Sequence, residues 1–444
     1  MTACAIEPTA RDEDDDRTPH ADCVITADGT YAARLARAGE SWFPERWTLD
    51  GPEPYAVPLP AHQPEEPGTE VHPMADGRVL IRRLVQGRHV FSLLYPTGPG
   101  TGELPLGAIE CPQEGSTRLR LLPPAPCGRR AYALAVGRHT TTLWLVAGGA
   151  FGPEHVAEIP GRCSGGVWLD RTGRILALDR EAGGRTKAVV VDLERGGEVS
   201  PLLQIAADSD DRLLLADPDS GLLLIRSDAP SPGEARLGWG VLGSTFPVRF
   251  PESLRLPGCT LTPFAIQPGQ VLLPENSAVA LRADGPFGTW VGVWRPAERH
   301  LHQLAAPEGW LAGSGLWTRD GVLRLPYATG TEPCGVAHVT VPHRTKPTST
   351  TPDAAPITAP NTAPNTTCDT TPATTSNTPT STTTATTTAA TTTRRTPPTT
   401  NPPPAPTPNT PATPLTPLTP HPPEPPTPRP VPLQQAPLGR LVTN

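Results

Sequence analysis

The segment Asp217-Pro218-Asp219-Ser220-Gly221 has the residue spacing in this chain that is best suited to binding a metal ion. Two aspartates one residue apart, followed by glycine, begin a calcium-binding loop, in which side-chain oxygens surround a hard cation. Such a loop also needs a bidentate Glu at its twelfth position, where this chain has Asp228. Asp and Gly form tight hairpins without a metal. We therefore interpret the segment as a hairpin turn, with a calcium site at Asp217 and Asp219 as the alternative, and expect no other cofactor.

Two tryptophans stand at matching positions of a repeated pattern, and a charged residue follows each of them two positions later. They are Trp168, followed by Asp170, and Trp317, followed by Arg319. These four residues are the candidates for binding a ligand, because an indole ring and a charged group can line a pocket together. Packing of the indole rings between neighbouring repeats is the alternative, and we favour it for both tryptophans.

The motifs of well-known catalytic sites are missing from the sequence. It has no Gly-x-Ser-x-Gly nucleophile turn, no phosphate-binding Gly-rich loop and no dinucleotide fingerprint. None of the eight cysteines forms a Cys-x-x-Cys pair, which argues against a zinc or dithiol redox site. The sequence therefore identifies no catalytic residue.

Charge and hydropathy narrow the choice of partners. The formal net charge is −7 and no basic stripe is present, so we expect no binding to nucleic acid. No stretch reaches about 18 consecutive apolar residues, so the sequence predicts no transmembrane helix. The N-terminus lacks the basic and apolar regions of an export signal, and an acidic run follows at Asp12–Asp16. We expect a cytoplasmic, monomeric protein without a membrane partner.

A pattern of short strands, repeated seven times between residues 22 and 343, must position these side chains. The fourth copy is the clearest: Gly166–Asp170, the turn Arg171–Gly173, then Arg174–Leu178, Lys187–Leu193 and Glu198–Leu203. A period of roughly 40–50 residues with four strands in each unit is typical of β-propeller blades. The sequence therefore predicts an all-β propeller of seven four-stranded blades.

Copies five and six, within residues 206–306, are the least regular, so six blades are the alternative. In copy five we place the first turn at Asp210-Asp211 and the next two strands at Leu213–Ala216 and Leu222–Ile225.

The two ends of the pattern suggest how the ring closes. Copy seven lacks a fourth strand, and the short apolar segment Ala3–Pro8 belongs to no copy. Since propellers commonly close by letting one terminus complete the last blade, we expect residues 2–8 to add its outer strand. A frayed N-terminus is the alternative. The predicted organisation is a closing strand and acidic linker over 1–20, a propeller over 21–345 and a disordered Thr/Pro-rich tail over 346–444.

The stretch 170–197, with Asp-Arg-Thr-Gly-Arg-Ile-Leu-Ala-Leu and Val-Val-Val-Asp-Leu-Glu-Arg-Gly-Gly, resembles the repeats of TolB-like and WD40-like propellers. The Gly-His and Trp-Asp dipeptides of true WD40 repeats are absent in register. A weaker resemblance, through Arg46–Gly51, Tyr55–Pro60 and Gly166–Trp168, is to streptogramin-lyase-type propellers. These resemblances imply the fold and say almost nothing about activity.

Two functions from different classes remain open. The first is a non-enzymatic binding scaffold, whose loops on one propeller face hold a protein or a small ligand. The second is a lyase or hydrolase with its site over the central channel.

Overall fold

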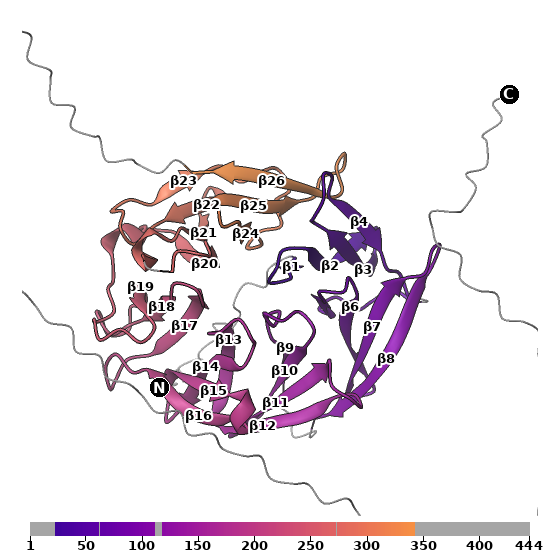
Figure 1. Cartoon of the computed structure of the whole chain (residues 1–444), viewed down its shortest axis with the longest axis horizontal. Helices are drawn as coiled ribbons and strands as arrows, with labels where there is room; N and C mark the ends of the chain where they lie inside the picture. Colours follow the sequence, from indigo (N-terminus) through magenta and orange to yellow (C-terminus); the bar gives the residue numbers. More distant parts are fainter. Residues whose placement is uncertain (1–22, 62, 112–117, 272, 342–444) are drawn as a thin grey trace, which may run out of the picture. The chain divides into compact units, whose positions relative to one another are not determined.

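The computed structural model describes residues 23–61, 63–111, 118–271 and 273–341, and within them the chain forms seven antiparallel sheets. The sheets follow one another around a ring, and each is one blade (Figure 1). The predicted closing strand within 1–20 and the predicted tail over 346–444 lie outside the described residues.

The first four blades have four strands each. Blade 1 contains β1 (Val24–Ile25), β2 (Tyr31–Ala38), β3 (Ser41–Thr48) and β4 (Tyr55–Pro58). Blade 2 contains β5 (Glu70–Pro73), β6 (Val79–Val85), β7 (Arg88–Pro96) and β8 (Thr101–Glu110). Blade 3 contains β9 (Arg118–Leu121), β10 (Ala131–Val136), β11 (Thr140–Ala147) and β12 (Glu154–Pro160). Blade 4 contains β13 (Arg162–Trp168), β14 (Ile175–Ala182), β15 (Arg185–Asp192) and β16 (Glu198–Leu203).

The last three blades are less uniform. Blade 5 contains β17 (Asp211–Ala216), β18 (Leu222–Ser227) and β19 (Arg236–Val241). Blade 6 contains β20 (Thr260–Ile266), β21 (Val279–Gly285), β22 (Gly288–Trp294) and β23 (His302–Leu304). Blade 7 contains β24 (Leu316–Trp317), β25 (Val322–Tyr327) and β26 (Gly335–Thr340). In the described part of the chain, three short 3-10 helices lie in the connections: η2 (Leu193–Arg195), η3 (Glu252–Leu254) and η4 (Pro274–Asn276).

The first strand of each blade lies near the ring's centre and the last lies at its rim (Figure 1). In an antiparallel meander, the first-to-second and third-to-fourth connections leave the same end of the blade. We call this end of all blades the turn face. The opposite end, which carries the second-to-third turns and the connections between blades, is the linker face.

Within the described residues the core consists of seven apolar clusters, and each lies at the joint between two neighbouring blades. The sequence agrees with this arrangement, because strands that are buried on both faces are nearly continuous apolar runs. Leu176 of β14 faces blade 3, for example, while its neighbour Ala177 faces blade 5. Alternate side chains along each strand therefore pack into the two joints on either side of the blade.

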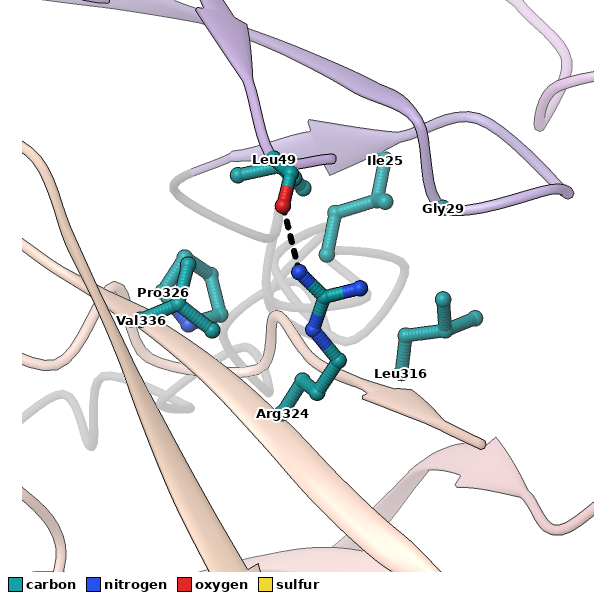
Figure 2. Close-up of a pocket in the computed structure, with 7 residues that line it drawn as sticks. All are labelled: Ile25, Gly29, Leu49, Leu316, Arg324, Pro326 and Val336. Atoms are coloured by element: carbon teal, nitrogen blue, oxygen red, sulfur yellow. Dashed lines mark hydrogen bonds between the residues drawn. The ribbon is translucent and has the colours of Figure 1, made fainter. Parts of the chain in front are cut away.

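The ring closes between blades 7 and 1. Ser314 donates its hydroxyl to the carbonyl oxygen of Cys23 at 2.5 Å and accepts the Cys23 amide at 3.2 Å. The Arg324 guanidinium donates to the carbonyl oxygen of Leu49, across a small cavity lined by Ile25 and Val336 among others (Figure 2).

The prediction of seven blades is confirmed, and the alternative of six is wrong. The register proposed for copy five is wrong by one strand. Asp211–Ala216 is the innermost strand of blade 5, and the inner turn is Asp217–Gly221 rather than Asp210-Asp211. Two aspartate-rich segments lie six residues apart there, so local turn signals could not decide which one opens the blade.

Blade 5 has three strands within the described residues, where the repeat predicts four, and blade 7 has the three strands that copy seven supplies. In blade 5 the fourth strand is reduced to a single bridge between Trp239 and Arg249, with both N···O distances at 2.9 Å. Pro247 and Pro251 lie two residues to either side of Arg249. Because proline has no N–H to donate, the pairing cannot extend beyond this bridge.

Candidate functional site

Asp170 closes the inner turn of blade 4. Its carboxylate accepts the amides of Thr172 and Arg174 at 3.0 Å and that of Ile175 at 2.7 Å. Three amides on one carboxylate order the turn in the way that an Asx turn does. Asp170 therefore positions the neighbouring Arg171 on the turn face rather than offering a free carboxylate.

Asp217 and Asp219 form the inner turn of blade 5, which confirms the predicted hairpin. Asp217 accepts the amide of Ser220 at 2.9 Å and its hydroxyl at 2.6 Å. Asp219 forms an ion pair with Arg171 across the joint between blades 4 and 5. Both carboxylates are thus engaged by the protein, and the described ranges contain no group of three or more His, Cys, Asp or Glu side chains that could hold a metal ion.

Asp219 links the inner turns of several blades. The hydrogen bond from Arg171 lowers the pKa of the Asp219 carboxyl, and the charge of Arg319 and the amide of Gly269 lower it further. Gln267 of blade 6 donates its side-chain amide to the carbonyl oxygen of Arg319 in blade 7 at 3.1 Å. Asp219 and Arg319, two of the residues singled out in the sequence, are therefore brought together near the channel.

The two tryptophans lie elsewhere, inside the joints. Trp168 is 7% exposed, donates its indole N–H to the carbonyl oxygen of Pro123 at 3.1 Å and packs on Tyr132 with ring centroids 5.4 Å apart. Trp317 is 2% exposed and packs in the cluster between blades 6 and 7. Both rings occupy the packing positions that we favoured. Neither lines the cavity between blades 7 and 1.

The turn face also carries a group of exposed apolar side chains that sequence reasoning missed. Eleven large apolar side chains of the described residues are exposed, and seven of them lie on this face: Tyr55, Tyr95, Phe151, Leu242, Phe246, Val271 and Leu273. Their signal in the sequence was weak, because single aromatic or aliphatic residues in loops are common. Only the arrangement of the blades shows that they share a face.

Four of these side chains form what we call the loop patch: Leu242, Phe246, Val271 and Leu273. The exposed fraction is 75% for Phe246 and 62% for Val271. The loop that carries Leu242 binds the blade 5 inner turn, because the Leu242 amide donates to the carbonyl oxygen of Gly221 at 2.8 Å. The loop that carries Val271 borders the same turn through Gly269, whose amide interacts with Asp219. Apolar loops thus flank the charged centre of Arg171, Asp219 and Arg319.

No helix in the described part of the chain is long and apolar enough to cross a membrane. The lyase or hydrolase considered from the sequence stays a prediction, since no arrangement of described side chains tests it.

No protein-family model matches the chain, and no curated protein does. Solved structures do match. An oligogalacturonate lyase in complex with manganese is 13% identical with a TM-score of 0.47, over 72% of this chain and 90% of that one. The β-propeller domain of the Trilobed protease from Pyrococcus furiosus is 11% identical with a TM-score of 0.43, over 71% and 93%. A putative TolB from Agrobacterium tumefaciens is 15% identical with a TM-score of 0.35, over 51% and 78%.

Likeness at this level carries no argument about what the chain binds or catalyses. The presence of TolB proteins among the matches agrees with the TolB-like resemblance of residues 170–197, and this agreement concerns the propeller fold alone.

Proposed function

We propose that this chain is a non-enzymatic binding propeller that holds a protein partner against its turn face. The observation that carries the proposal is the loop patch, in which apolar side chains are exposed on two loops that both border the inner turn of blade 5. Exposed apolar side chains beside polar groups are typical of protein interaction sites.

Interactions between the inner turns of neighbouring blades make the turn face a rigid scaffold for such a site. The inner turns of blades 4 and 5 are joined by the ion pair of Arg171 with Asp219, and those of blades 6 and 7 by the hydrogen bond from Gln267. Because loops held on a rigid scaffold lose little conformational entropy on binding, a partner would gain most of the energy from burying Phe246 and its neighbours.

The experiment uses the full chain as bait for cross-linking, with captured proteins identified by mass spectrometry and then titrated as purified partners. The test variant is the double substitution Leu242→Ser with Phe246→Ser. Since burying one large apolar side chain is worth roughly 1.5–3 kcal/mol, we expect the affinity for a true partner to fall by at least about tenfold.

The matched control is Phe287→Ser, which removes an equally apolar and 99% exposed side chain from the linker face, in the turn between β21 and β22. This variant should bind the partner as the unaltered chain does. Equal binding by the double variant, or loss of binding in Phe287→Ser alone, would contradict the proposal.

A further inference from the structure

The joint between blades 6 and 7 contains buried polar groups without a hydrogen-bond partner. Gln267 follows β20, Arg295 follows β22 and Trp317 ends β24, so all three stand at the turn-face end of this joint. The feature is separate from the loop patch and does not depend on the function proposed for it.

Strand register places Gln267 and Arg295 on the same side of blade 6. Ile266 pairs with Val279, and Val279 pairs with Trp294, so the next row across the blade is Gln267, Ala278 and Arg295. The backbone amide of Gln267 donates to the carbonyl oxygen of Ala278 at 2.7 Å, which confirms this row.

This row faces blade 7. Ala278 is fully buried in the cluster that contains Trp317 and Leu323 of blade 7. Alternation along the strands puts the Gln267 and Arg295 side chains on the same side as Ala278, whose own side chain is small.

The buried groups hold more donors than acceptors. The Arg295 side chain is only 3% exposed, and its single partner is Glu298, with Nη1 and Oε1 3.3 Å apart. Nε and Nη2 of Arg295 and Nε1 of Trp317 have no partner. Among acceptors at the joint, Oε1 of Gln267 has none either.

The two unpaired donors of Arg295 lie on one edge of its guanidinium, and this is the edge that binds a carboxylate through two parallel hydrogen bonds. A buried guanidinium that lacks such partners is strongly destabilising, whereas an oxyanion would satisfy both donors and offset the charge. Glu298 cannot supply this, because it binds Nη1 and also lies 2.8 Å from Nε2 of His302.

We propose that the joint between blades 6 and 7 binds a carboxylate group. The Nε and Nη2 edge of Arg295 holds its two oxygens, and the indole N–H of Trp317 donates a further hydrogen bond. The carboxylate enters from the turn face, where Arg319 is exposed. It belongs either to a small free acid or to the C-terminus of a peptide.

The first measurement follows binding of ¹³C-formate to the full chain by NMR line broadening, with ionic strength held constant by sodium chloride. Saturable binding is expected. In Arg295→Lys, which keeps the charge and loses the two-donor edge, affinity should fall by roughly tenfold or more. Trp317→Phe removes the N–H and keeps a buried ring, so a smaller loss, about threefold to tenfold, is expected.

The control is Arg255→Lys, which alters an exposed arginine paired with Glu234 on the linker face and should leave formate binding unchanged. Circular dichroism establishes which variants are folded. If Arg295→Lys does not fold, Trp317→Phe still tests the site.

A second arm separates the two sources of the carboxylate. A tripeptide with a free C-terminus is compared with the same peptide amidated. Binding of formate and of the free peptide assigns a peptide terminus, and binding of formate alone assigns a small acid. The proposal is overturned if neither probe binds, as for a joint that holds buried water only, or if binding survives unchanged in both Arg295→Lys and Trp317→Phe.

Discussion

The joint between blades 4 and 5 and the joint between blades 7 and 1 solve the same packing problem with different chemistry. At the first, Asp211 is fully buried and accepts from Lys187 Nζ at 2.8 Å, while the hydroxyls of Ser209 and Ser227 bind its other oxygen at 2.8 and 2.6 Å. At the second, an apolar cluster around Trp47 and Leu49 is supplemented by a few hydrogen bonds to backbone groups.

The difference follows from how the blades are connected along the chain. A short connection joins blades 4 and 5 directly, so a polar network can order that connection and align the two blades. Blades 7 and 1 come from opposite ends of the described chain, and no connection within the described residues joins them. Closure there relies on apolar burial, which does not depend on direction, and it leaves the small cavity of about 10 Å³ between the two blades (Figure 2).

The largest expected effect is at the closing joint. Trp47 is fully buried in the cluster between blades 7 and 1. Trp47→Ala should lower the free energy of unfolding by about 3–5 kcal/mol, because the lost burial leaves a cavity that the joint can only partly refill. Chemical denaturation measures the loss, and hydrogen exchange should increase first in β1 and β24–β26. Trp42→Ala, in the same strand but only half-buried, is the control. An equal loss in both variants would contradict a special role of the joint.

The second effect concerns the polar joint. Asp211→Asn removes the charge that pairs with Lys187, and we expect a loss of about 2–3 kcal/mol at neutral pH. Burial alone would raise the pKa of Asp211, but hydrogen bonds from Lys187, Ser227 and others outweigh it and lower that pKa below the ordinary 3.8.

The pH dependence has a definite sign. Because the folded-state pKa of Asp211 is lowered, its carboxylate stabilises the fold above pH 3.8, and this stability is lost as pH falls through the folded-state value. The difference between the unaltered chain and Asp211→Asn should therefore shrink on acidification. A difference that is independent of pH between 7 and about 2 would show that the charge does not hold this joint.

The smallest effect separates packing at the closing joint from backbone strain. Gly29 and Gly39 both have positive φ, +74° and +62°. A Cβ on Gly29 would lie within overlap distance of Leu316 in blade 7, while one on Gly39 would meet nothing within 4 Å. Both alanine variants should lose stability through strain, and Gly29→Ala should lose about 1–2 kcal/mol more. Equal losses of stability in thermal unfolding would mean that Leu316 moves away from the added Cβ at no cost in stability.

Local chemistry explains why so much of the fold could be predicted. Turns such as Asp28-Gly29 and Asp320-Gly321 carry their own signal, and each blade is built from strands that pair with their neighbours in the chain. Where two turn signals compete, as in copy five, the same reasoning failed by one strand. The local turn signals could not predict the single bridge at Arg249 either. That pairing ends because the flanking prolines have no N–H to donate.

The candidate site was predicted only in part. Asp219 and Arg319 are 100 positions apart, and nothing local relates them. The loop patch depends on which ends of the blades share a face, and the row of Gln267, Ala278 and Arg295 depends on register across three strands.

By itself the sequence determined the all-β class, the seven repeats and the positions of most turns, because these depend on backbone preferences and on alternation over a few residues. The tertiary structure alone decided which blades meet, which charges pair and which polar groups are left buried without a partner. Those outcomes depend on contacts between residues far apart in the chain, where small differences in packing geometry determine the balance between burial and desolvation.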